Sequence, residues 1–232
     1  MKNINLTLIL ALLISIQLFS QDNYTKKIRL GINVGTNTFD LNKNDYFDKY
    51  EKKISYSFGV SLEYMLNEKT SVITNLNYER KVMQLDNFRY REIDGNDYTA
   101  TDKLKFSYLN VPLILRYYVV NKAFLDLGGF YNHSLNIEND TSVNETGEST
   151  TLWEHQNVIK KNDYVISLGI GYKFKFSDKN HLSVELKDEL GLANIANNPN
   201  TSLTELKTNT IKLILNWELP PLRSRKSVTS RN

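Results

Sequence analysis

The sequence predicts an all-β chain that folds as an eight-stranded antiparallel up-and-down transmembrane β-barrel. Three observations support this prediction: large apolar residues recur at every second position along eight segments, short and long links alternate between these segments, and aromatic residues gather near segment ends. Because a strand directs successive side chains to opposite faces, each alternating segment is a strand with one apolar face and one polar face.

The segment ISYSFGVSLEYM, residues 54–65, shows this alternation most clearly. Seven further segments have the same period, and no helical periodicity separates them. Pro112 lies within one of them and has no amide hydrogen to donate, so we expect a bulge or distortion there. The eight expected strands, in chain order, are residues 28–36, 54–65, 71–80, 107–119, 123–135, 164–174, 181–192 and 211–219.

The links between the expected strands alternate in length. Three are tight polar turns, at residues 67–69, 121–122 and 177–180. The other four are long, at residues 40–53, 86–103, 139–161 and 194–207. Outer-membrane barrels have short periplasmic turns and longer external loops, so the asymmetry favours that class. A soluble lipocalin-like barrel that shows the same asymmetry by chance is the alternative.

The apolar faces carry ring side chains near both ends of the strands. Tyr and Trp favour the boundary between hydrocarbon and water, so two such groups predict girdles at two membrane interfaces. If the apolar face turned inward instead, the chain would be a secreted soluble barrel that binds an apolar ligand. The expected lipid-interface aromatics are Tyr64, Tyr117, Tyr172, Phe174 and Trp217 near the short turns, and Tyr56, Tyr131 and Tyr164 near the long loops.

The polar faces would then line the inside of the barrel. Eight strands enclose a space only wide enough for side chains, so opposite charges would pair there and small residues would make room for long ones. The sequence therefore predicts a packed polar lumen and no open channel. The expected lumen charges are Arg29, Glu63, Glu79, Arg116, Asp126, Lys173, Glu185, Lys187, Lys212 and Glu218.

Asp188 departs from this pattern, because it lies on the apolar face of its strand. A carboxylate that faces lipid is costly near the middle of a membrane and less costly at its edge. We therefore expect Asp188 near the external rim, or re-aimed by a bulge.

Composition and the N-terminal segment point to an exported protein. The chain has 29 Lys and Arg against 26 Asp and Glu, a balance that gives no reason to expect nucleic acid as a partner, and it has no Cys. Residues 1–20 have the layout of a cleaved signal peptide: Lys2, an apolar run, and Ser20 at the cleavage point. An uncleaved anchor helix is the alternative. Residues 21–219 would form the barrel, and residues 220–232 a basic disordered periplasmic tail.

No set of residues points to catalysis, a cofactor or a metal. His133 precedes Ser134, but neighbours on a strand point to opposite faces, and His155 and His181 lie elsewhere in the sequence. Three scattered histidines form neither a metal site nor a base–nucleophile pair. We therefore expect no enzymatic activity and no cofactor. A membrane-embedded lipid-modifying enzyme is the alternative.

Several segments together resemble the PorT-like family of outer-membrane β-barrel proteins: IRLGINVGTN, SFGVSLEYML, YLNVPLILRYYV, LDLGGFYN, ISLGIGYKF and ELGLANI. The resemblance implies an integral barrel in the outer membrane of a Gram-negative cell envelope. The namesake of the family is associated with protein secretion and surface attachment, and no catalytic residues come with the family. We expect a monomeric barrel surrounded by outer-membrane lipids, with other cell-envelope proteins as the partners of its external loops.

Overall fold

The computed structural model of the protein describes residues 28–42, 49–91, 97–120, 122–143, 149–150, 159–176, 180–197 and 205–219. The expected signal peptide and the basic C-terminal segment lie outside these residues. In the part of the chain that is described, no helix is long and apolar enough to cross a membrane.

Eight long strands form a closed antiparallel ring, which confirms the predicted fold. Each long strand pairs with the long strands before and after it, and pairing of β1 with β9 closes the ring. A two-residue strand, β6 (Ser149–Thr150), adds to the end of β5. The strands of the ring are β1 (Ile28–Asn42), β2 (Glu51–Met65), β3 (Thr70–Arg91), β4 (Asp97–Tyr118), β5 (Ala123–Val143), β7 (Asn162–Lys175), β8 (His181–Gly191) and β9 (Lys207–Glu218).

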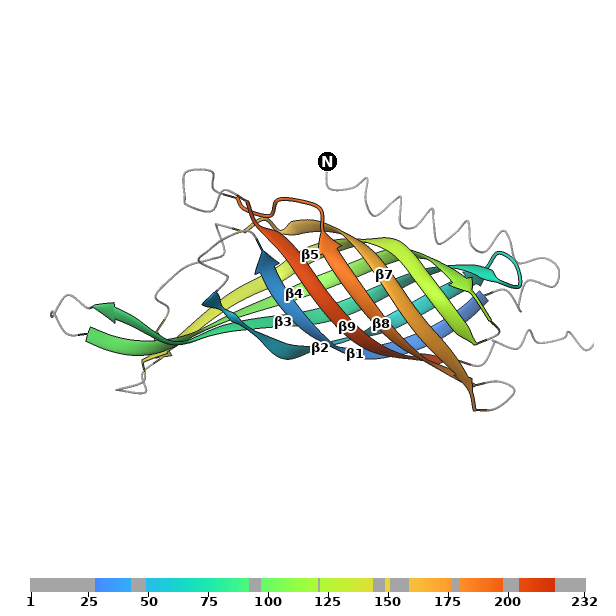
Figure 1. Ribbon diagram of the computed structural model, residues 1–232, viewed down its shortest axis with the longest axis horizontal. Helices are drawn as coiled ribbons and strands as arrows, with labels where there is room; N and C mark the ends of the chain where they lie inside the picture. Colours follow the sequence, from blue (N-terminus) through green and yellow to red (C-terminus); the bar gives the residue numbers. More distant parts are fainter. Residues whose placement is uncertain are drawn as a thin grey trace, which may run out of the picture.

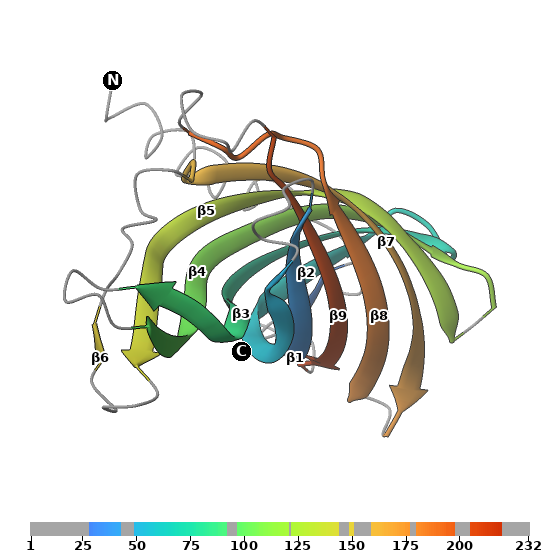
Figure 2. The same cartoon turned by 60° about the vertical axis from the view of Figure 1, so that its left-hand side comes forward.

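The strands run obliquely around the barrel (Figure 1). The links β2–β3, β4–β5 and β7–β8 lie at one end, which we call the turn end, and the remaining links lie at the other, which we call the loop end. At the loop end the β3–β4 hairpin extends well beyond the other strands, toward the left of Figure 1. Figure 2 shows the end of β5, with β6, on the same side of the barrel as this hairpin.

The two-residue alternation of side-chain direction along each strand decides which side chains point into the barrel. In β4 every even-numbered residue from Ala100 to Tyr118 is buried, while the odd-numbered residues from Val111 to Tyr117 are exposed. Successive side chains of a strand point to opposite faces, so this pattern places the even-numbered residues inside the ring.

Strands β3, β4 and β5 are longer than the sequence predicts. β3 and β4 contain 22 residues each, and the part of segment 86–103 that is described is mostly a paired hairpin, although a long loop is expected there. β5 continues to Val143, into a second expected loop. A tilted strand needs about 9–11 residues to span the hydrocarbon of a membrane, so these three strands project beyond it.

The expected distortion at Pro112 appears as a gap in the β3–β4 pairing and not as a bulge. The β3–β4 register is the same on both sides of Pro112, because Thr74 pairs with Leu113 and Asn77 with Asn110. The Thr74 hydroxyl donates to the Pro112 carbonyl at 2.9 Å and so bridges the two strands where proline has no N–H. The register shifts lie closer to the loop end, in β2, in β3 and between β4 and β5.

Candidate functional site

We call the part of the barrel between the turn end and the level of Glu79 and Lys212 the lower barrel. The outer face of the lower barrel carries an apolar band. Leu113, Leu168 and Leu213, on three different strands, are all about half exposed or more. A water-soluble barrel would bury such residues, and large exposed apolar surfaces mark contact with a membrane or a protein. The band therefore contradicts the alternative of a soluble barrel with an apolar interior.

The aromatic residues expected at the lipid interface lie on this outer face. Tyr64 is half-buried and the other seven are exposed. The rings of Tyr172 and Phe174 lie 4.8 Å apart between centroids near the turn end, and those of Tyr131 and Tyr164 lie 5.6 Å apart nearer the loop end. Both pairs lie where the apolar band gives way to polar surface. These positions suit anchoring at two membrane interfaces, which stays a prediction.

A middle layer of charges fills the lumen of the lower barrel. Arg116 donates through Nε and Nη2 to the two carboxylate oxygens of Asp126, both at 2.8 Å. The Arg116 Nη2 atom also lies 2.8 Å from Glu185 Oε1, and Lys187 Nζ lies 2.9 Å from Glu185 Oε2. All four side chains are buried. Such charges are tolerated away from water only when they are paired, which this layer achieves across β4, β5 and β8.

An aromatic ring supports the middle layer. The Arg116 guanidinium lies 3.5 Å from the centre of the Phe124 ring, which is within the range of a cation–π contact. Gly171 makes room for this ring, because a Cβ at that position would collide with the Phe124 side chain. A small residue beside a long one is the arrangement expected for a filled eight-stranded lumen.

A second layer of charges lies above the first, toward the loop end. Lys212 Nζ lies 2.5 Å from Glu79 Oε1 and 2.7 Å from Glu189 Oε1. Lys81 Nζ lies 3.4 Å from Glu79 Oε2 and donates to the Thr210 hydroxyl at 3.1 Å. The four charged residues and Thr210 are all buried, so this layer also fills the cross-section of the lumen.

A third layer lies below, next to the turn end. Lys173 Nζ donates to the Tyr118 hydroxyl at 2.7 Å, lies 3.3 Å from Glu63 Oε2 and pairs with Glu218. The Tyr118 hydroxyl donates to Glu63 at 2.8 Å, and Arg29 Nη1 lies 3.4 Å from the same carboxylate. This layer forms the floor of the opening at the turn end.

The ten residues expected as lumen charges all point into the barrel, and each lies within ion-pair distance of an opposite charge. Four further buried charged residues were not among them: Lys81, Asp102, Asp163 and Glu189. Glu189 lies four residues after Glu185, and Lys81 two residues after Glu79, so each pair shares one face of its strand. Extending the alternation along these strands therefore predicts both Glu189 and Lys81 as lumen residues. Asp102 falls in the segment that the sequence assigns to a loop.

The interior changes character above the second layer, at the loop end. Phe39, Leu41, Met83, Leu104 and Phe106 are fully buried and pack in one apolar cluster, which we call the loop-end core. The prediction of a polar lumen therefore applies to the charge layers of the lower barrel, where a small apolar cluster of Ile73, Ile114, Phe130 and Val165 is also buried, and is wrong for the loop end. The physical reason is that the outside of the loop end is polar, so the interior is where its apolar side chains are shielded. Other members of the loop-end core are Tyr50, Tyr108, Ile137, Ile159, Ile195 and Leu206.

The outer surface of the loop end carries paired charges. Arg80 Nη2 on β3 lies 2.5 Å from Glu138 Oε2 on β5, and Lys105 on β4 pairs with Asp140 on β5. The hydrogen bond from the Arg80 guanidinium lowers the pKa of the Glu138 carboxyl below its ordinary value. These pairs belong to a surface in contact with water and lie above the apolar band.

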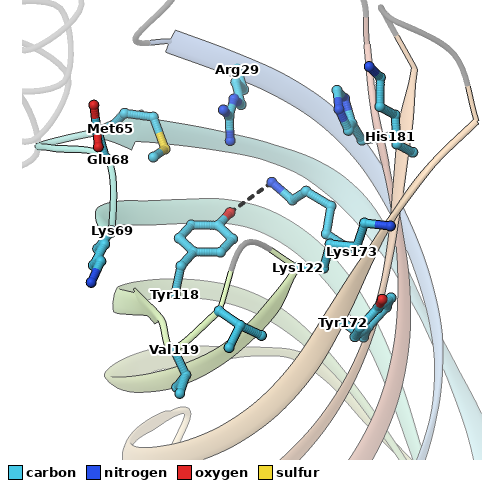
Figure 3. A pocket seen from close by; sticks show the side chains of 12 residues that line it. Arg29, Met65, Glu68, Lys69, Tyr118, Val119, Lys122, Tyr172, Lys173 and His181 are labelled. Carbon is cyan, nitrogen blue, oxygen red and sulfur yellow. Dashed lines mark hydrogen bonds between the residues drawn. The ribbon is translucent and has the colours of Figure 1, made fainter.

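The turn end opens into a basic cavity of about 760 Å³, which we call the mouth (Figure 3). Lys173 and Tyr118 lie at its floor, where Figure 3 shows their hydrogen bond. The cationic side chains that line the mouth come from β1, β7, β8 and two turns, and Glu68 is the carboxylate among the lining residues. They are Arg29, Lys69, Lys122, Lys173 and Lys175, with His181 beside them.

Asp188 lies within the apolar band and not at its rim. It is exposed, it pairs across the sheet with Leu168 and Ile211, and Leu186 and Leu190 flank it on the same face of β8. The β7–β8 and β8–β9 registers run through Asp188 without a shift, so no bulge re-aims it. The expectation of a rim position or a bulge is therefore wrong. Its carboxylate has no ion pair or hydrogen bond within the described part of the chain.

The histidines do not assemble into a site. His133 and Ser134 point to opposite sides of β5: Ser134 is buried, while His133 Nδ1 lies 2.8 Å from the Asn162 side-chain oxygen on the outer surface. His181 lies at the turn end, and His155 is outside the described residues. Across the described ranges, no group of three or more His, Cys, Asp or Glu side chains is placed to hold a metal ion.

Comparison with known proteins identifies the family. Residues 19–197 match the family model described as "Outer membrane protein beta-barrel domain". No curated protein matches the sequence. Similar solved structures include Ail, the attachment invasion locus protein of Yersinia pestis, in complex with the heparin analogue sucrose octasulfate. The two sequences are 15% identical, the match covers 83% of this chain and 99% of that chain, and the TM-score is 0.40. Neisserial surface protein A matches with 10% identity, 82% and 96% coverage and a TM-score of 0.43.

A third similar structure is OprG from Pseudomonas aeruginosa, with 15% identity, 83% of this chain and 93% of that chain covered, and a TM-score of 0.36. The family match covers well over half of the chain, and it agrees with a closed ring that is apolar outside and charged inside. The chain belongs to the outer membrane protein beta-barrel domain family and is an integral barrel of the cell outer membrane.

Proposed function

We propose that the protein is a PorT-like barrel that neither conducts solutes nor catalyses a reaction, and that serves surface assembly or secretion through its loop end. The observation that supports this proposal best is the stack of three charge layers across the lumen. Each layer links side chains from several strands, and the members of the upper two are buried. A solute would have to displace paired charges at three levels, whereas a pore leaves an aqueous path.

The loop end is the part of the molecule suited to contacts outside the cell. The β3–β4 hairpin extends past the apolar band, and the loop-end core packs beneath it with Leu104 and Phe106 fully buried. A packed core holds a projecting element in a fixed orientation, and binding surfaces on fixed elements lose less entropy on association. The protein would thus present a rigid platform to another cell-envelope protein.

Conductance measurements test the closed lumen. The purified protein, with its insertion checked by heat-modifiable migration on a gel, is added to planar lipid bilayers. We expect no stepwise conductance above the lipid background. A stable open channel would overturn the assignment of the lumen as a filled core.

Removal of the hairpin tests the role of the loop end. Replacing residues 86–101 by Asn-Gly joins Leu85 to Asp102, which are paired in the β3–β4 ladder, through a two-residue turn. After cross-linking in intact cells, we expect the full-length barrel to migrate as part of a larger complex and the trimmed barrel to migrate alone. Lys160→Gln, an exposed change elsewhere at the loop end, is the control and should leave the complex intact. A complex that survives the trimming would refute this role for the hairpin.

A further inference from the structure

The mouth at the turn end carries an excess of positive charge that the lumen does not neutralise. Five Lys and Arg side chains line it, while the carboxylates within or beneath it are Glu63, Glu68 and Glu218. Short turns face the periplasm in outer-membrane barrels, so the mouth opens toward that compartment. We propose that the mouth binds an acidic peptide segment of a periplasmic protein.

Four of the five cations of the mouth fall into two groups with different surroundings. Arg29 and Lys173 are held at the floor by Glu63, which lies 3.4 Å and 3.3 Å from their nitrogens. Lys69 and Lys122 stand on the β2–β3 and β4–β5 turns, and their side chains have no partner in the described part of the chain. The floor is thus built and satisfied, whereas the turn lysines are available to an incoming anion.

The two available lysines belong to turns that are each bonded to a neighbouring strand. The Tyr118 amide donates to the Lys69 carbonyl at 2.7 Å, and the Lys173 amide donates to the Lys122 carbonyl at 2.7 Å. These backbone bonds fix both turns to the strands that form the floor of the mouth. The backbones of Lys69 and Lys122 are therefore held at the rim of the mouth, while their side chains can reach several carboxylates along one chain.

The size and position of the mouth favour a peptide over other anions. A cavity of about 760 Å³ is much larger than a single phosphate group and can hold several side chains. Its floor is formed by Tyr118 and Lys173, whose side chains are buried inside the ring of strands, whereas lipid headgroups surround the outer wall. An acidic polypeptide from the periplasm matches both the charge and the access.

Binding of fluorescein-labelled hexaglutamate to the full-length protein in detergent tests the proposal. The test variant is Lys69→Glu/Lys122→Glu, and the matched control is Lys103→Glu/Lys160→Glu, which makes the same change in net charge at the loop end. We expect the test pair to raise the Kd for hexaglutamate about tenfold or more, since each change replaces attraction by repulsion, and the control pair to leave it within about twofold. Labelled hexaglutamine should not bind to either protein.

Each other outcome overturns the proposal in a distinct way. Equal weakening by both pairs would mean that only net charge matters, and absence of hexaglutamate binding would remove the site. Full displacement by inorganic pyrophosphate at equal concentration would indicate a small-anion site. Displacement by phosphatidylglycerol vesicles would indicate a lipid site. Heat-modifiable migration checks that the test pair still folds. The result is independent of the hairpin experiment, because the two sites lie at opposite ends of the barrel.

Discussion

The lower barrel and the loop end are made from the same strands but are arranged in opposite ways. In β4, which keeps its even-numbered residues inside throughout, Arg116 points into the lower barrel while Leu115 faces outward. Nearer the loop end, Phe106 points inward and Lys105 outward. One strand thus carries a polar interior with an apolar surface, and then an apolar interior with a polar surface.

The difference teaches that the solvent, not the strand, decides which face is apolar. Where lipid surrounds the ring, apolar side chains are stable outside and charges must be satisfied by one another inside. Where water surrounds it, the hydrophobic effect places apolar side chains in the interior, as in any soluble protein. The level of Glu79 and Lys212 marks the change, and it coincides with the upper edge of the apolar band.

The largest effect is expected from a break in the middle charge layer. Arg116→Ala would leave Asp126 and Glu185 with only Lys187 as a cationic partner in a buried setting. Removing one partner of a buried ion pair typically costs about 3–5 kcal/mol. We expect a loss of that size in the free energy of unfolding, measured by urea titration in lipid vesicles.

The matched control for this loss is Arg80→Ala, which removes an arginine from the outer surface of the loop end. A surface pair such as Arg80–Glu138 contributes at most about 1 kcal/mol, so the control should be far milder. Equal losses in the two variants would show that the middle layer is hydrated and that the lumen is not a closed core.

The second prediction concerns the loop-end core. Leu104 is fully buried there, and Leu104→Ala should cost about 3 kcal/mol through lost burial and the cavity that remains. Because the lower barrel has its own polar interior, we expect the loss to appear as faster hydrogen exchange in β3, β4 and β5 above the apolar band. Faster exchange throughout the ring would mean that the two regions unfold as one unit.

The sequence predicted the lower barrel well because its alternation is regular. The outward residues of β4 from Leu109 to Tyr117 are apolar or aromatic at every second position, and the other segments follow the same period with isolated exceptions such as Thr74 and Asp188. The lumen charges follow from the same count. Which charge pairs with which depends on register, and a period of two does not specify register.

The loop end was missed for a physical reason that β4 makes clear. Leu104, Phe106 and Tyr108 are apolar at even positions, whereas Leu109, Val111 and Leu113 are apolar at odd positions. A change of phase looks like the end of a strand, although the backbone continues and only the surroundings change. The mouth was missed as well, because its lysines lie on separate turns that only the closed ring brings together.

The third prediction concerns a carboxylate in the described part of the lower barrel that faces outward, although the other lumen-level charges point inward. Asp188 faces outward among Leu168, Leu186 and Ile211. An acidic side chain facing lipid costs less than a basic one, so Asp188→Leu should stabilise the barrel by about 1–2 kcal/mol in vesicles. Asp188→Asn, which removes the charge and keeps a polar group, should gain less. Destabilisation by the leucine would show that Asp188 is in contact with a polar partner and not with lipid.

The smallest effect is expected at the Arg80–Glu138 pair on the outer surface of the loop end. The pKa of Glu138 lies below its ordinary value in the folded protein, so the pair stabilises the fold above the carboxyl pKa of the unfolded chain. That contribution disappears as the pH falls through the lowered pKa. Glu138→Gln should therefore cost at most about 1 kcal/mol at neutral pH, measured by hydrogen exchange at the loop end, and nothing in strong acid. High salt should reduce the effect, because this pair is exposed to water, unlike the buried pairs of the upper two charge layers. A loss independent of both pH and salt would instead assign Glu138 a packing role and place it with the interior of the molecule.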